Sequence, residues 1–141
     1  MKSYFFIVLL FCVFGCSNSK KDEVKETKQQ LYEQSEMAAL MLQMYAVNLE
    51  NKSRALQGNK PLEMPEEFLN IHSAKLTDPS DRTASFKSYS DFYLATYQQN
   101  DDLSKDSLII NHNKTVNSCI ACHKTTCIGP IPKIKKLLIQ Y

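Results

Sequence analysis

The sequence lacks a marked charge excess, an internal repeat and the alternation of apolar and polar residues that is typical of β-strands. Its 17 lysines and arginines and 15 aspartates and glutamates leave a formal net charge of only +2. A nucleic-acid partner would need a concentrated basic patch, so we expect none. Because strand alternation and repeats are missing, a sheet or a solenoid is not expected either. The sequence therefore predicts a single all-α domain.

The N-terminal segment has the pattern of a processing signal. Lys2 supplies a positive charge, and the apolar run over residues 4–14 is too short for a helix that crosses a hydrocarbon core of about 30 Å. Residues 13–16, Val-Phe-Gly-Cys, resemble the cleavage box of bacterial lipoproteins. The resemblance implies a signal peptide over residues 1–15 and a lipid on Cys16. An ordinary signal peptide or an uncleaved anchor is the alternative.

Residues 16–23 are polar and predict a tether, followed by a helical domain over residues 24–141. Residues 24–57 contain no glycine or proline and predict one long helix that ends near Gly58. A stripe with 4-3 spacing is expected to be its packed face: Leu31, Ser35, Ala38, Leu42, Tyr45, Leu49 and Leu56. A second stripe beside it suggests a further neighbour: Met37, Met41, Met44 and Asn48.

Two shorter segments follow. Residues 65–67, Pro-Glu-Glu, predict the first turn of a short second helix. Phe68, His72 and Leu76 are expected to share one of its faces. Asp78 is expected to cap a third helix. Its buried side is predicted to consist of Phe86, Tyr89, Tyr93, Thr96 and Tyr97.

The last long helix is expected to begin with Ser104 as its cap and to end at Gly129-Pro130. One more short helical segment is expected within residues 131–141. The sequence thus predicts a four-helix-bundle-like fold with a short second helix.

Late in this last helix the chain reads Cys119-Ile120-Ala121-Cys122-His123, the attachment pattern of haem c. On a helix Cys119 and Cys122 lie one turn apart on one face, so both sulfurs can reach the two vinyl groups of a porphyrin. His123 follows on the adjoining edge of that face, from which its imidazole can bind the iron. The pattern predicts one covalently bound haem c.

Two other chemistries use similar residues. A thioredoxin-like cysteine pair normally opens a helix in a βαβ unit, and this chain shows no strands. Cys119, Cys122, His123 and Cys127 could also form a Cys₃His zinc site, although such sites typically take their ligands from two elements. Cys127 is the odd thiol, either a small hydrophobe under the haem or a reactive group.

A helical domain with this pattern late in its last helix resembles cytochrome c′ and its six-coordinate relatives, the class II cytochromes. It is also similar to small cytochrome lipoproteins of Gram-negative bacteria, in which cysteine, Gly-Pro-Ile and a lysine-rich helix follow the motif, as residues 127–136 do here. The resemblance implies a monohaem protein of the cell envelope, anchored in the outer membrane and facing the periplasm or the cell surface. It leaves both a monomer and a homodimer open.

The sixth iron position decides the function. In the six-coordinate relatives a methionine of the first helix fills it, and the resemblance puts Met37 first as this metal ligand because it follows Tyr32 in a similar setting. Met41 and Met44 are the alternatives on the same stripe. All three methionines could instead be core residues.

The remaining histidines and the C-terminal lysines are secondary candidates. His72 is an alternative iron ligand, whereas His112 lies three turns before His123 on the same helix and cannot reach the opposite side of the iron. Three lysines could pair with haem propionates, present a docking patch or form a solvated face: Lys133, Lys135 and Lys136.

Two functions follow from these residues. With a methionine opposite His123, the protein would carry electrons to redox partner proteins while its lipid anchor binds the membrane. With an open sixth position, it would be a five-coordinate haem protein that binds NO or CO. A peroxidase would need a distal base and a charged polarising residue, and we find no convincing set, so we expect no enzyme and no catalytic residues.

Overall fold

A computed structural model describes residues 33–98 and 104–140, which belong to one compact unit. In this part of the chain every regular element is a helix, so the predicted all-α fold is confirmed; the four-helix bundle stays a prediction. The α-helices are α2 (Glu36–Leu56), α3 (Ala84–Gln98), α4 (Lys105–His123) and α5 (Ile131–Ile134). The 3₁₀-helices are η1 (Glu66–His72), η2 (Pro79–Asp81) and η3 (Lys135–Leu137).

The predictions for the N-terminus, namely the signal peptide over residues 1–15, the tether over residues 16–23 and a lipid on Cys16, lie outside the described residues. Within residues 33–98 and 104–140, no helix has the length and apolar character needed to cross a membrane.

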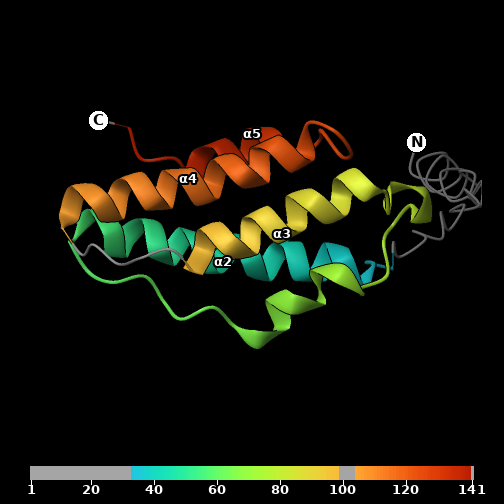
Figure 1. Ribbon diagram of the computed structural model, residues 1–141, viewed down its shortest axis with the longest axis horizontal. Coiled ribbons are helices and arrows are strands. Elements are labelled where there is room, and N and C mark those ends of the chain that lie inside the picture. The colour runs from blue at the N-terminus through green and yellow to red at the C-terminus, as the bar shows by residue number, and fades with distance from the viewer. Residues whose placement is uncertain (1–32, 99–103, 141) are drawn as a thin grey trace, which may run out of the picture. The chain divides into compact units, whose positions relative to one another are not determined.

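Helix α4 lies at the centre of the packing (Figure 1). It contacts both α2 and α3 along its length, while α5 and η3 fold back onto it after the chain reverses. The short η1 packs against α2 and α3 and takes the place expected for a short second helix. The core is divided accordingly: one cluster joins α2, η1 and α3, and a second joins α4 to the C-terminal segment.

Helix α2 begins later than predicted. Ser35 has an extended backbone (φ −66°, ψ 155°), and its hydroxyl accepts a hydrogen bond from the Ala38 amide at 3.1 Å, as an N-cap does. The continuous helix predicted through Ser35 is therefore wrong at this point. The end near Gly58 is confirmed: the helix stops at Leu56, and Gly58 has a φ of +74°, which glycine adopts without steric cost.

The buried face of α2 is also different from the predicted one. Leu42, Leu49 and Leu56 of the 4-3 stripe are 50%, 49% and 45% exposed, so that prediction is wrong. The residues that are buried follow the methionine stripe: Met37, Leu40, Met44, Asn48, Asn51 and Ala55. Hydropathy does not count asparagine as a core residue, but these two amides are buried because hydroxyl and backbone partners satisfy them.

The 3₁₀ geometry of η1 corrects the face predicted for the second helix. With three residues per turn, Phe68 and Ile71 share the buried face, and His72 is exposed. Leu76 lies beyond the element and is partly buried.

Asp78 caps only a short turn and not the third helix. Its carboxylate accepts a hydrogen bond from the Ser80 amide at 2.9 Å in η2. Helix α3 begins separately, where the Thr83 hydroxyl accepts from the Phe86 amide at 3.1 Å. Of the predicted buried side chains of α3, only Tyr89 is not buried, and it is partly exposed.

Helix α4 has the predicted cap, because the Ser104 hydroxyl accepts from the Ser107 amide at 3.3 Å. The prediction that α4 ends at Gly129-Pro130 is wrong, since the helix stops at His123. The hydroxyls of Thr125 and Thr126 donate to the Cys122 carbonyl at 2.8 and 3.3 Å and satisfy it in place of a continued helix. The predicted short helical segment near the C-terminus is confirmed as α5 and η3.

Candidate cofactor site at the end of α4

A mainly apolar cavity of about 350 Å³ lies where α4 ends. Helix α2 supplies one wall of the cavity, α5 supplies another, and the segment around Leu76 and Asp81 supplies a third. Cys122 and His123 of α4 also line it. Pockets of roughly 300–1,000 Å³ with apolar walls and few polar groups are typical of small-molecule and cofactor sites. A second cavity of about 30 Å³ continues between α4 and the methionines of α2, and Cys122 and His123 border both.

The His123 side chain is oriented by the loop that follows α4. Its Nδ1 lies 2.7 Å from the carbonyl oxygen of Cys127. A carbonyl can only accept, so Nδ1 donates and carries the ring proton, which leaves the lone pair on Nε2. Histidines that bind metals are commonly held in this way, with the second nitrogen bonded to a carbonyl or carboxylate. In the neutral ring, Nε2 is thus the nitrogen of His123 left for another partner.

The two cysteines of the motif lie one turn apart at the end of α4. Cys122 borders both cavities, and Cys119 borders the smaller one, with its Sγ 3.4 Å from the Thr115 carbonyl. Both are free thiols. Burial, with the neighbouring Cys122 as a second cause, raises the pKa of Cys119 to about 12.

Burial also raises the pKa of Cys122. Thiol–disulfide exchange and zinc binding both use the thiolate. Burial therefore disfavours the thiolate form of both cysteines. Among the described residues there is also no group of three or more histidine, cysteine, aspartate or glutamate side chains arranged to hold a metal ion.

Methionines of α2 face the motif across the cavity. Met37 and Met41 line the larger cavity that His123 borders, while Met44 lines only the smaller one. Met37 and Met44 are buried, and Met41 is partly exposed. Each of the three methionines therefore lines a cavity that His123 also borders, and Met41 lines both.

The other two histidines lie elsewhere. His72 is exposed at the surface, with its Nε2 3.4 Å from the Asp91 carboxylate, and it borders neither cavity. His112 is buried, and its Nε2 lies 2.9 Å from the Leu137 carbonyl. It holds the C-terminal segment against α4 and does not reach the cavity beside His123.

Sequence reasoning missed part of the lining. Leu42 and Tyr45 line the cavity, although the 4-3 stripe predicts a packed helix face for them. Phe86 and Asp81 come from segments whose sequence shows no local sign of a site. In the structure, the half-exposed Leu42 indicates a binding site, because a ligand in the cavity would cover this apolar side chain. Cys127 lines the same cavity and is otherwise exposed.

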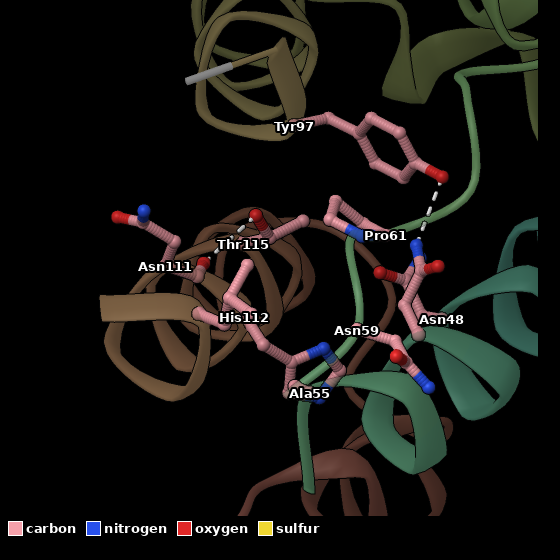
Figure 2. A pocket seen from close by; sticks show the side chains of 10 residues that line it. Asn48, Ala55, Asn59, Pro61, Tyr97, Asn111, His112 and Thr115 are labelled. Carbon is pink, nitrogen blue, oxygen red and sulfur yellow. Dashed lines mark hydrogen bonds between the residues drawn. The ribbon is translucent and has the colours of Figure 1, made fainter. Parts of the chain in front are cut away.

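A different, polar cavity of only about 20 Å³ lies along the second half of α2 (Figure 2). Tyr97, His112 and Thr115 surround it, together with the asparagines of α2. A cavity of this size has room for one water molecule. It is too small for a cofactor. Another cavity, of about 320 Å³, is lined by His72, Arg82 and Lys87 and by no residue of the Cys119-to-His123 motif, so the site at the end of α4 is the candidate.

No protein-family model, no curated protein and no solved structure gives a significant match to the chain.

Proposed function

We propose that the protein is a monohaem c-type cytochrome that carries electrons in the envelope of a Gram-negative bacterium, as a lipoprotein anchored through Cys16. The observation that carries the proposal is the placement of His123. Its Nδ1 is held by the Cys127 carbonyl, and His123 borders an apolar cavity that Met37 and Met41 also line. The Cys119-to-His123 motif and its resemblance to class II cytochromes support the same assignment.

Each group at the site has a role in this proposal. The thiols of Cys119 and Cys122 would hold the porphyrin edge through thioether bonds, and His123 Nε2 would bind the iron. Haem c supplies a one-electron Fe(III)/Fe(II) couple. Met37 is our first choice for the sixth ligand, and Met41 is the alternative on the same wall. The apolar side chains of the cavity would exclude water and so influence the reduction potential.

The visible spectrum of the purified protein tests the proposal. We expect protein from a host that matures c-type cytochromes to show a Soret band and, when reduced, a low-spin spectrum that persists under carbon monoxide. A high-spin spectrum that shifts with carbon monoxide would favour the five-coordinate gas-binding protein. If the Soret band is missing, the haem assignment is wrong.

The lipid anchor needs a separate measurement, because it lies outside the described residues. We expect the wild-type chain to sediment with outer membranes and the Cys16→Ser variant to be lost from them. Equal sedimentation of both chains would contradict the anchor without affecting the haem assignment.

A further inference from the structure

Lys133 differs from the other C-terminal lysines in its relation to the cavity at the end of α4. Lys133, Lys135 and Lys136 are all exposed, but among the described residues Lys133 is the only lysine or arginine that lines this cavity. Its Nζ lies over the ring of Tyr45, 4.6 Å from the centroid. Tyr45 also lines the cavity, so a contact between α5 and α2 holds this cation at the cavity wall.

The charges around Lys133 leave it available for an anion. None of the carboxylates in the described residues forms an ion pair with it. No aspartate or glutamate follows Asp106 in the sequence, so its own part of the chain offers no acidic partner. Among the described residues that line the cavity, the one acidic residue is Asp81, which belongs to η2 and not to the wall made by α2 and α5. One wall of the cavity therefore carries a cation and another an anion.

We propose that Lys133 binds a propionate carboxylate of the haem and so orients the cofactor, with its carboxylate edge toward the wall of Tyr45 and away from Asp81. This inference rests on the proposed function. Haem c bears two propionates, and the cavity is otherwise lined largely by apolar side chains, in which an unpaired carboxylate would be costly.

The test compares the reduction potentials of holo-proteins that differ in one lysine. Lys133→Gln removes the charge, Lys133→Arg keeps it, and Lys135→Gln removes a nearby exposed charge as the matched control. We expect Lys133→Gln to have a lower potential than the wild type, because a cation near the iron disfavours Fe(III). We also expect its potential to change with pH between about pH 5 and 8, since a propionate without its cation titrates at a higher pH. Lys133→Arg and Lys135→Gln should behave as the wild type does.

The outcomes separate this inference from the proposed function. Equal shifts in Lys133→Gln and Lys135→Gln would indicate a general charge effect and overturn the propionate contact, as would no shift in either. In both cases the Soret band would still support a cytochrome. A wild-type protein without a Soret band would overturn the proposed function and this inference together. Circular dichroism of each variant checks that the helices are intact.

Discussion

The two halves of α2, residues 36–45 and residues 46–56, face very different surroundings. In the second half, Asn48 donates to the Met44 carbonyl at 2.8 Å and to the Tyr93 hydroxyl at 3.1 Å. Asn51 donates to the Tyr97 hydroxyl at 2.9 Å and accepts from the Leu62 amide at 2.7 Å. The first half instead lines an apolar cavity of about 350 Å³.

The difference shows which part of the helix is complete without a ligand. Every buried polar side-chain atom among the described residues has a hydrogen-bond partner, so the second half needs nothing further. Side chains that border a cavity have fewer dispersion contacts than those in a close-packed interior. The first half is thus the part that a bound group would stabilise, which fits the proposed haem.

The largest effect is expected from removing the attachment cysteines. The double variant Cys119→Ala/Cys122→Ala should lose all covalently bound haem, measured by haem staining of a denaturing gel. Amide hydrogen exchange should then rise in residues 36–45 and stay low in residues 46–56. Cys127→Ala is the control and should keep its haem. Equal exchange in both halves would contradict the comparison.

The next largest effect is expected from the sixth ligand. Met37→Ala should convert the reduced protein from a low-spin to a high-spin spectrum and allow carbon monoxide to bind, because no thioether would fill the sixth position. Met44→Ala is the control, since this side chain lines only the smaller cavity. If Met41→Ala has the effect and Met37→Ala does not, the ligand is Met41.

A substitution in the second half of α2 is expected to change the stability of the protein but not its haem spectrum. Asn51→Ala leaves the Leu62 amide without its partner and should lower the free energy of unfolding by about 1–3 kcal/mol, measured by urea denaturation. Asn59→Ala, at an exposed amide, should change it by less than about 0.5 kcal/mol. A changed haem spectrum in Asn51→Ala would show that the two halves are coupled.

The smallest expected effect is the contribution of His112 to the pH dependence of stability. Burial lowers the pKa of this imidazole below its ordinary value of 6.5. Below about pH 6.5 the unfolded chain therefore binds a proton that the folded chain does not, and stability falls as the pH falls. The wild type should lose more stability than His112→Gln when urea denaturation at pH 7 is compared with pH 5. A similar loss in both would assign the dependence to other groups.

Helix boundaries were predictable where a local cap determines them. Ser104 begins α4 and Gly58 follows α2 as the sequence indicates, because a side-chain oxygen or a left-handed backbone acts within one turn. The end of α4 was not predictable from Gly129-Pro130. At the observed end, the Cys122 carbonyl accepts from the Thr125 amide and from the hydroxyls of Thr125 and Thr126, which hydropathy does not indicate.

The buried face of α2 could not be chosen from hydropathy. The leucine stripe is more apolar than the stripe with Asn48 and Asn51, yet the asparagine stripe is buried because α3 brings Tyr93 and Tyr97 opposite the two amides. A sequence pattern shows the apolarity of each face but not which partners will meet its polar groups.

By itself the sequence determined the helical class of the domain, several of its caps and the spacing of Cys119, Cys122 and His123, because these depend on residues within a few turns of one another. Only the tertiary structure decided what surrounds that motif. It brought the Met37 face of α2 and Lys133 of α5 to one cavity and placed His72 outside it. These residues are far apart in the chain, and their meeting depends on how the helices pack against α4, which no local pattern encodes.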